Sequence, residues 1–528
     1  MLFNSYAFLF MFLPLTLAGF FWIARFGHEA AILWLVAASL FFYGWWNPVY
    51  LWLILGLTLA NFAIGRQLGQ AAAQGRPRAG RVWLILGIGG NLGVLAWFKY
   101  ANFAVGTVNA LAGSQLFLQT VVLPLGISFF IFQKIAYLAD AYRGLAREYK
   151  LSHFMLFVTF FPQLIAGPIV HHGEIMPQFM ARATLRPRLD HIGIGVTILT
   201  IGLFKKAVLA DSIAPYATPV FEAAARGEPL SLLVAWGGAL AYTLQLYFDF
   251  SGYSDMAIGA ARLFGIYLPL NFHSPYKATN IVEFWRRWHM TLSQFLRDYL
   301  YIPLGGNRHG PLARNRNLLL TMLLGGLWHG AGWTFVMWGG LHGVYLIVNH
   351  AWGRAAAALW PAGLLPARLG RLLAWGLTFL AVVVGWVFFR SGSFAAALVM
   401  LQAMAGCNGV ALPNAVAVQL GDLWTLLARA GVGTYLGGGA TFVLTWVWIA
   451  ALLPLILLAP NTQQIMASAR PALTAFGGSD RHALPLLPWL AERLRWRPTR
   501  AWAIAAGLAT AWSVLALTRV SEFLYFQF

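Results

Sequence analysis

The chain has 528 residues, of which 60% are hydrophobic, 15% are aromatic and only 10% are charged. Ordinary soluble domains carry about 25% charged residues, so this composition excludes a water-soluble globule. Lys and Arg number 36 against 16 Asp and Glu, which gives a formal net charge of +20 at pH 7. In a membrane protein such an excess is expected in cytoplasmic loops, and basic residues scattered between apolar stretches do not favour nucleic-acid binding.

Apolar stretches suited to crossing a lipid bilayer recur along the whole chain. A crossing helix needs about 20 mostly apolar residues, and we expect about ten to thirteen crossings when shorter or broken ones are counted. The sequence therefore predicts an all-α polytopic membrane protein with one integral membrane domain over residues 1–528. The apolar segments are 7–24, 31–46, 50–65, 82–97, 121–138, 154–170, 192–209, 232–248, 318–348, 372–389, 442–458 and 501–517.

The arginines predict how these segments are oriented. The first apolar segment follows no basic residue and is followed by Arg25, which is unlike a signal peptide and places the N-terminus outside the cytoplasm. Residues 66–81 contain four arginines and no acidic residue. This loop follows the third crossing, so the alternation of crossings also places it in the cytoplasm. Residues 467–500 are also basic and are predicted to form a cytoplasmic loop. The C-terminal tail, residues 520–528, is then expected on the outer side.

Several kinds of site are disfavoured by the sequence. Cys407 is the only cysteine, so an intrachain disulfide or a thiolate metal cage has no support. There is no Walker A, G-x-S-x-G or H-E-x-x-H motif. His171, His172 and Glu174 lack a defined ligand spacing and are interpreted as part of an interfacial loop. We therefore predict no metal site.

Polar residues gather between positions 247 and 343, and this region is predicted to hold the functional site. Ionisable groups inside apolar stretches are costly, so they usually face a cavity or a partner. Asp249 and Asp255 would either bind a cation or pair with arginines such as Arg286 and Arg287. We favour pairing, because a carboxylate in a membrane needs a partner.

Residues 283–301 have the pattern of an amphipathic helix. At 100° per residue, five polar side chains fall within a stripe of about 120°: Glu283, Arg286, His289, Ser293 and Arg297. The opposite face carries Phe284, Trp288, Phe295 and Tyr299. The pattern alone favours a helix on the cytoplasmic surface with a solvated basic face, and a functional polar face is the alternative.

His329 is the main candidate for chemistry, because it lies in an apolar stretch, 318–338, that has no other ionisable side chain. A structural histidine and a functional one are equally compatible with that position. A partner for His329 would have to come from another helix, and His289 is the best candidate. His342 follows 13 positions later, about 20 Å away on an unbroken helix, and is expected to be structural or supporting.

Four motifs resemble those of the membrane-bound O-acyltransferase superfamily, and within it the bacterial alginate O-acetyltransferase branch, which also includes peptidoglycan and cellulose acetylation proteins. They are YFDFSGYSDMAIG (247–259), NFHSPYKATNIVEFWRRWHMTLSQFLRDYLYIPLGG (271–306), LWHGAGWTFVMWGGLHG (327–343) and EFLYFQF (522–528). The resemblance covers nearly the whole chain, with the catalytic core motifs in 247–343. It implies a helical bundle in the bacterial inner membrane that encloses a central tunnel, with His329 deep inside and His289 beside it.

The resemblance also implies an activity. Acetyl would move from a cytoplasmic donor, acetyl-CoA, to an extracytoplasmic polysaccharide such as alginate, by way of a periplasmic SGNH-type acetyltransferase in a polysaccharide biosynthesis and export complex. His329 would take the proton of the attacking hydroxyl, and His289 would orient the carbonyl or stabilise the oxyanion. Lys277, Arg286 and Arg287 would attract the phosphates of coenzyme A. No permanently bound cofactor is expected.

The ending FLYFQF resembles the C-terminal motif of a small membrane partner in the related teichoic-acid D-alanylation system. Tyr525 is therefore a hypothetical acyl relay, and an aromatic anchor at the membrane interface is the alternative. At the level of the whole protein, the alternatives are a transporter or flippase for a polysaccharide or lipid-linked sugar, with the polar cluster along its path, and a scaffold for a polysaccharide synthase.

Overall fold

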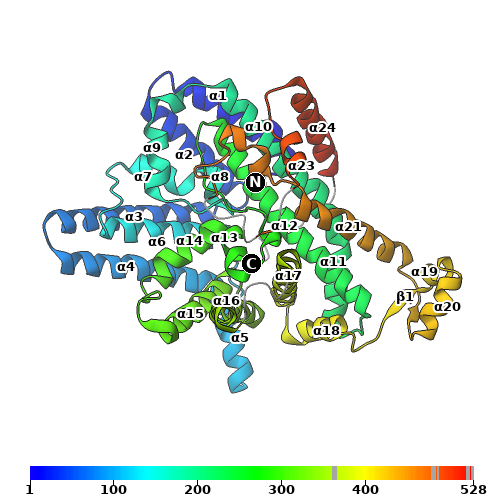
Figure 1. Cartoon of the computed structure of the whole chain (residues 1–528). Helices are drawn as coiled ribbons and strands as arrows, with labels where there is room; N and C mark the ends of the chain where they lie inside the picture. Colours follow the sequence, from blue (N-terminus) through cyan, green and yellow to red (C-terminus); the bar gives the residue numbers. More distant parts are fainter. Residues whose placement is uncertain (360–365, 477–482, 485–486, 519–523, 525–528) are drawn as a thin grey trace.

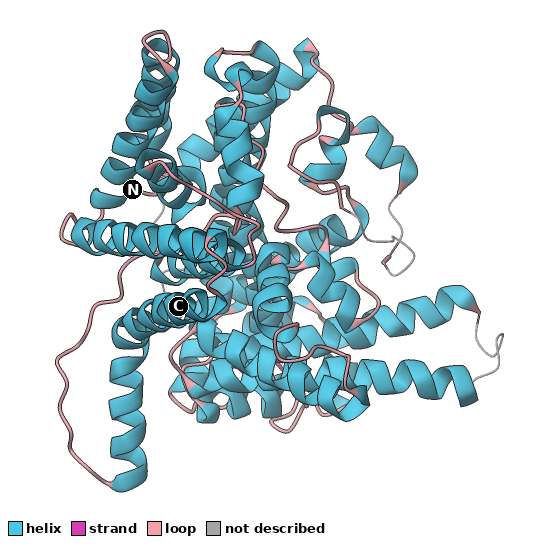
Figure 2. Cartoon of the chain, turned by 90° about the vertical axis from the view of Figure 1, so that its left-hand side faces the viewer, coloured by secondary structure: helices cyan, strands magenta, loops and turns pink. Residues whose placement is uncertain are grey.

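The computed structural model describes the chain except for residues 360–365, 477–482, 485–486, 519–523 and 525–528. The described part is mostly helical and contains almost no strand (Figures 1 and 2). The first third contains η1 (Ala7–Phe12), α1 (Leu13–Ile23), α2 (His28–Gly44), α3 (Tyr50–Ala73), α4 (Pro77–Leu95), η2 (Ala96–Tyr100), α5 (Ala101–Ala112), α6 (Ile127–Tyr142), α7 (Leu151–Thr159), α8 (Phe161–Leu164) and α9 (His172–Met180).

The remaining elements complete the bundle. The central part contains η3 (Arg182–Leu185), α10 (Leu189–Phe204), η4 (Lys205–Ala210), α11 (Asp211–Ala225), α12 (Leu232–Leu263), η5 (Pro275–Lys277), α13 (Ile281–Arg287), α14 (Met290–Leu296), η6 (Arg297–Tyr301), α15 (Gly310–His329) and α16 (Trp333–Leu359). The last part contains α17 (Ala367–Arg390), α18 (Phe394–Met404), β1 (Ala411–Pro413), α19 (Asn414–Gln419), α20 (Asp422–Arg429), β2 (Gly433–Tyr435), α21 (Gly439–Leu458), α22 (Thr462–Ile465), η7 (Ala467–Ala469), α23 (Pro488–Arg493) and α24 (Arg500–Ala516). β1 and β2 form a short parallel pair beside α19 and α20, at the far right of Figure 1.

Long apolar helices dominate the described residues, as expected for a membrane protein. Five helical segments are long and apolar enough to cross a membrane: Tyr50–Ala73, Pro77–Ala112, Leu189–Ala225, Arg368–Arg390 and Gly439–Leu458. Four shorter apolar helices cover Ala7–Ile23, His28–Gly44, Phe394–Met404 and Arg500–Ala516. All except Phe394–Met404 overlap an apolar segment predicted from the sequence.

Three predicted crossings are interrupted or shortened. The segment 121–138 becomes helical only at Ile127. The segment 154–170 is divided between α7 and α8, and the segment 318–348 breaks after His329. Hydrophobicity cannot locate such breaks, because the apolar composition continues across them.

Helix α12 is the central element of the bundle in Figure 1. Its 32 residues span about 48 Å, and α10 packs closely along it. A Cβ atom on Gly202 of α10 would lie 2.6 Å from the Gly252 oxygen, and one on Gly259 would lie 2.5 Å from the Leu199 nitrogen. Glycine at these positions therefore lets the two helices pack backbone against backbone, as small residues do in membrane bundles.

Two clusters of buried hydrophobic side chains form the interior. One cluster joins the second half of α12 to α2, α6, α7 and α14, and the other joins the first half of α12 to α11, α13, α17 and α18. Trp328 belongs to the first cluster, whereas Trp338 and Phe389 belong to the second. The ring of His329 contacts all three of these aromatic rings, so it lies where the two clusters meet.

Candidate functional site

Two of the predicted site residues lie side by side in the interior. The ring centroids of His289 and His329 are 6.2 Å apart, and the ring planes are inclined by 62°. His329 is the last residue of α15, and His289 lies between α13 and α14. His289 is 0% exposed and His329 is 5% exposed. The structure thus brings together two imidazoles from separate helices, while their chemical roles stay predictions.

The backbone turns sharply at His289. Its φ angle is +42°, in the left-handed region that residues other than glycine seldom adopt. This turn separates α13 from α14, so the prediction of one continuous amphipathic helix over 283–301 is wrong. The predicted solvated face is only partly correct, because Arg286 and Arg297 are exposed whereas Glu283 and His289 are buried. Unusual backbone angles of this kind are often found at functional sites.

Asn271 holds the His289 ring in one orientation. The Asn271 Oδ1 atom lies 3.0 Å from His289 Nδ1 and also accepts a hydrogen bond of 3.0 Å from the Thr291 hydroxyl. The Asn271 backbone oxygen accepts a further bond from the Met290 amide. Because an amide oxygen can only accept, Nδ1 of His289 carries a proton, and in the neutral ring Nε2 carries the lone pair. Donation from Nε2 to an oxyanion therefore requires the protonated form of His289.

Aromatic rings enclose His329. Its centroid lies 5.0 Å from the Trp328 ring, 5.1 Å from the Trp338 ring and 5.3 Å from the Phe389 ring. The chain reverses after His329, and α16 then packs against α15. A Cβ atom on Gly326 would lie only 2.2 Å from the Phe335 oxygen, so this close helix pair depends on glycine.

The reversal places Trp338 against both His329 and His342. The Trp338 ring lies 4.9 Å from the His342 ring, and His342 is fully buried. Trp285 of α13 donates its Nε1–H to His342 Nδ1 over 3.2 Å. His342 therefore connects α16 to α13, and its supporting role stays a prediction.

Lys99 is a buried residue beside the histidines that the sequence reasoning missed. Its ammonium group donates to the backbone oxygens of Trp328 and His329, the latter over 3.4 Å, and to the Ser128 hydroxyl over 3.3 Å. The last carbonyl groups of a helix have no helical partner, and a cation there is favourable. Lys99 therefore fixes the end of α15 that carries His329. Its only sequence signal is an ionisable group next to an apolar segment, and the predicted crossing ended at residue 97, before Lys99.

The neighbouring hydroxyl of Tyr100 holds the same helix end, because it donates to the Leu327 oxygen over 2.9 Å. Together η2 and α6 thus provide the polar support for the C-terminal turn of α15.

The two buried aspartates are paired, but with lysines. Lys206 Nζ lies 2.6 Å from Asp249 Oδ1 and 2.7 Å from Asp211 Oδ1, and Lys205 Nζ lies 2.7 Å from Asp255 Oδ2. The preferred ion pairing is therefore correct, whereas the arginines suggested as partners are wrong. Both lysines lie near the end of the apolar segment 192–209, where α10 continues as η4, and nothing local in the sequence indicates that they face the aspartates of α12.

The three cationic residues predicted to bind phosphate occupy different environments. Lys277 is 2% exposed and donates to the Ala459 oxygen at the end of α21 over 2.8 Å. Arg287 is 1% exposed and donates to Glu283 Oε1 over 2.8 Å. Arg286 is exposed, with Nη1 3.7 Å from Glu283 Oε2. Only Arg286 is thus accessible to a soluble anion, and the contacts of Lys277 and Arg287 explain their burial.

Arg286 lines an open cavity of about 460 Å³ that neither His289 nor His329 lines. The cavity also contains Arg297 and Tyr301 of η6, and it reaches Trp285 and Met290, which flank the His289 turn. It therefore combines exposed cationic groups with an apolar wall close to the candidate site.

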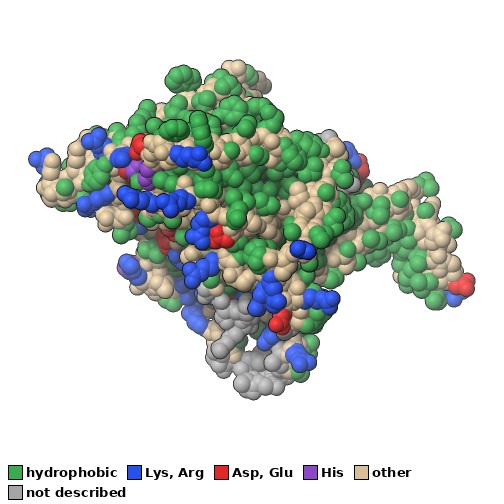
Figure 3. Space-filling view, turned by 90° about the horizontal axis from the view of Figure 1, so that it is seen from above, with side chains coloured by type: hydrophobic (Ala, Val, Ile, Leu, Met, Phe, Trp, Pro, Cys, Tyr) green, Lys and Arg blue, Asp and Glu red, His purple; other side chains and the backbone are tan. Residues whose placement is uncertain are grey.

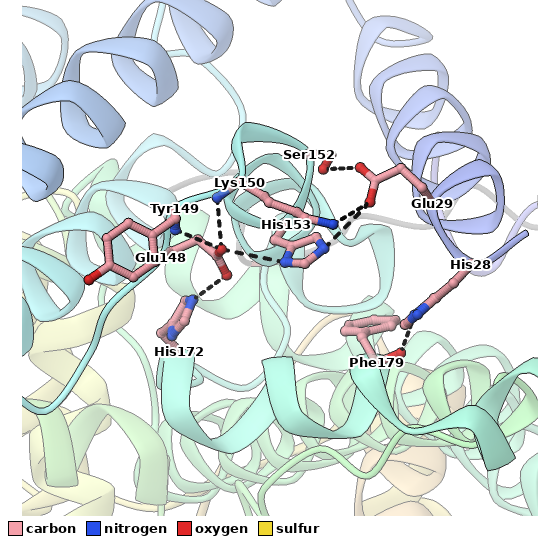
Figure 4. A network of polar contacts seen from close by, with 9 residues as sticks. All are labelled: His28, Glu29, Glu148, Tyr149, Lys150, Ser152, His153, His172 and Phe179. Carbon is pink, nitrogen blue, oxygen red and sulfur yellow. Dashed lines mark hydrogen bonds and ion pairs between the residues drawn. The ribbon is translucent and has the colours of Figure 1, made fainter.

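A second polar network lies away from the two histidines, where α2, α7 and α9 meet (Figure 4). Glu148 bridges His153, with atoms 3.4 Å apart, and His172, 3.2 Å apart, while Glu29 contacts Ser152 and Lys150. Burial acts to raise the pKa of Glu148, but hydrogen bonds from His172 and the Lys150 amide outweigh it, so the pKa is lowered. Within the described residues, no group of three or more His, Cys, Asp or Glu is placed to hold a metal ion. The network serves to join helices.

Comparison with known proteins gives consistent matches. A family model described as MBOAT, membrane-bound O-acyltransferase family, matches residues 87–365. A peptidoglycan O-acetyltransferase of Helicobacter pylori is 45% identical over 440 residues, covering 78% of this chain and 81% of the relative. A protein of Pseudomonas aeruginosa named "Probable alginate O-acetylase AlgI" is 40% identical over an alignment of 562 positions that covers 100% of both chains. A teichoic acid D-alanyltransferase of Streptococcus thermophilus is 31% identical over 241 residues, covering 44% of this chain and 57% of the relative.

Proposed function

The chain belongs to the membrane-bound O-acyltransferase family and is an O-acyltransferase, and we propose that it moves acetyl from cytoplasmic acetyl-CoA across the bacterial inner membrane for O-acetylation of an extracytoplasmic polysaccharide such as alginate. The onward carrier in this proposal is a periplasmic SGNH-type acetyltransferase that works with a polysaccharide biosynthesis and export complex. The single observation that carries the proposal is the pair of buried imidazoles 6.2 Å apart inside the family motifs.

The reaction assigned to these imidazoles is acyl transfer. A hydroxyl oxygen attacks the thioester carbonyl carbon while His329 takes the hydroxyl proton. The tetrahedral intermediate then collapses, the carbon–sulfur bond breaks, and the leaving thiolate receives the proton back from His329. Imidazole is suited to both proton transfers because its ordinary pKa is near 6.5. A protonated His289 would stabilise the oxyanion, since its Nε2–H is then available besides the Nδ1–H bound to Asn271.

The cavity beside Arg286 supports entry of the donor. Arg286 and Arg297 would attract the phosphates of coenzyme A, and the apolar wall near Met290 would receive the acyl arm close to His289. Lys277 and Arg287 take part in this proposal only as residues that hold the surrounding structure, because their side chains bind Ala459 and Glu283.

The C-terminal tail is the proposed acceptor. Tyr525 lies outside the described residues, and the neighbouring Leu524 is 1% exposed and belongs to the buried cluster around the first half of α12. Phe250 of α12 belongs to the same cluster, and its ring lies 4.8 Å from that of His289. In the proposal the phenol of Tyr525 attacks the donor and then passes acetyl to the periplasmic transferase.

The charge distribution supports the proposed orientation. The face seen in Figure 3 shows more Lys and Arg than Asp and Glu side chains, set in a largely hydrophobic surface. Basic loops tend to remain in the cytoplasm, so we assign the Arg-rich loops at 66–81 and 467–500 to that side and both termini to the periplasm.

One experiment separates acyl transfer from polysaccharide transport. The H329Q variant should be expressed in place of the natural chain, and both the amount of secreted polysaccharide and its acetyl content should be measured. Acyl transfer predicts normal secretion of a polymer without acetyl groups. Lost secretion with acetylation unchanged per sugar would favour the transporter, and no change in either quantity would favour a scaffold. An exposed-site variant, R495Q, serves as the control.

A further inference from the structure

A long groove lies between α24 and α10. Its volume is about 860 Å³. Its α24 wall runs from Thr499 to Val514, which corresponds to about 22 Å along the helix, and α10 and Phe10 of η1 form the opposite wall. The two helices are joined by a hydrogen bond of 2.9 Å between the hydroxyls of Thr200 and Thr510, and Thr510 also lines the groove. The groove is about as long as a fatty acyl chain.

One end of this groove is chemically different from the rest. Arg497 and Arg500 line that end together with Trp496 and Trp502, whereas the remaining wall is mostly apolar. Both arginines are exposed, and none of the described lining residues is acidic. Tryptophan favours the boundary between hydrocarbon and head groups, so the pattern is that of a site crossing from the membrane surface into the apolar layer.

The position of Arg500 gives a second argument for an anion. Arg500 is the first residue of α24, whose first turn contains no acidic side chain. A cation is unfavourable at the N-terminus of a helix, whereas an anion is favourable there. An anionic group between Arg497 and Arg500 would reverse this unfavourable arrangement and would also meet the first amide groups of α24.

We propose that this groove binds an anionic phospholipid, with its phosphate between Arg497 and Arg500 and one acyl chain along α24. Basic pockets at the ends of membrane helices bind anionic head groups through the same combination of charge and apolar surface. A transmembrane helix of another protein would fill the apolar part but would leave the two arginines without a counter-charge. The charge therefore favours a lipid over a protein as the occupant.

The test uses the purified full chain in detergent and measures binding of dioleoylphosphatidylglycerol and dioleoylphosphatidylethanolamine by native mass spectrometry. We expect the natural chain to prefer phosphatidylglycerol. The R497Q/R500Q variant should bind it roughly thirtyfold more weakly, since each arginine near the membrane surface contributes about 1 kcal/mol. R493Q/R495Q is the matched control, because these two exposed arginines lie in the same basic segment but do not line the groove. R497K/R500K should keep the preference.

A second pair of variants tests the apolar part. Gly507 lines the groove and a Cβ atom there meets no atom within 4 Å, so G507L places a side chain in the open groove and should weaken binding of both lipids. G93L places the same side chain at an equally open position on α4 and should have no effect. Equal binding of the two lipids by the natural chain, or equal loss in R493Q/R495Q, would overturn the proposal. So would recovery of a stoichiometric protein partner that G507L releases. None of these outcomes depends on acyltransferase activity.

Discussion

The Oδ1 atom of Asn271 lies 3.0 Å from Nδ1 of His289 and fixes which nitrogen of that ring carries the lone pair in its neutral form. Replacing Asn271 with Ala removes this acceptor and leaves the buried Nδ1–H without it, at a cost of about 1–3 kcal/mol. We expect the acyl-transfer rate of N271A to fall roughly tenfold to a hundredfold. The measurement is the rate constant of acetyl transfer by purified protein in lipid vesicles. T291A removes the hydroxyl that shares the same oxygen, and a larger effect of T291A than of N271A would contradict the assignment.

Lys99 should control the position of His329 through the end of α15. In K99M the carbonyl groups of Trp328 and His329 lose their donor, so we expect a lower melting temperature and a kcat reduced more strongly than KM is changed. The control is K150M, because Lys150 forms an exposed ion pair with Glu29 and such pairs contribute little. Unchanged kcat in a folded K99M protein would show that this contact does not affect the site.

Lys206 and Asp249 form a buried ion pair, and replacing either residue should destabilise the protein, but to different extents. K206M leaves the carboxylates of Asp249 and Asp211 without their shared cation, whereas D249N leaves Lys206 still paired with Asp211. Removing one partner of a buried pair costs about 3–5 kcal/mol, so K206M should be the more destabilising change. The double variant K206M/D249N should be more stable than K206M alone. Thermal unfolding in detergent measures all three, and additive effects would contradict this pairing.

His171 predicts a pH-dependent contribution to stability. Burial acts to lower its pKa, but a hydrogen bond with Asp140 and the charges of Glu174, Asp140 and Asp298 outweigh it, so the pKa is raised. A raised pKa in the folded state gives stabilisation that is complete below the unfolded value of about 6.5 and is lost as the pH rises through the folded value. The natural chain should therefore have a higher melting temperature than H171Q, and this difference should be larger at about pH 6 than at about pH 9. The opposite trend would show that burial dominates at His171.

The sequence was sufficient to predict the helical membrane fold and the proximity of His289 and His329. Apolar length reveals spanning helices, and a single ionisable residue in such a stretch, His329, is conspicuous. The polar stripe on residues 283–301 makes His289 the best candidate partner for His329. The two rings do lie side by side, although the continuous helix on which that stripe was drawn does not exist.

Other features depend on contacts between distant segments and could not be predicted. The left-handed turn at His289 is held by Asn271, which is 18 residues away in the sequence. Lys99 reaches the end of a helix 229 residues further on. The partners of Asp249 and Asp255 come from η4, which packs against α12 through glycine contacts that have no local sequence signature. Charge alone indicates arginines as partners of Asp249 and Asp255, because arginines are more numerous than lysines in this chain.

The central claim is that the imidazole of His329 takes the proton of the attacking hydroxyl. Its most direct test is the single-turnover rate of thioester cleavage by the reconstituted chain loaded with acetyl-CoA. This rate is compared between the natural protein and an H329Q variant that is folded to the same extent. General-base catalysis predicts that H329Q is slower by about 10²–10⁴-fold. A rate within threefold of the natural chain would contradict the account.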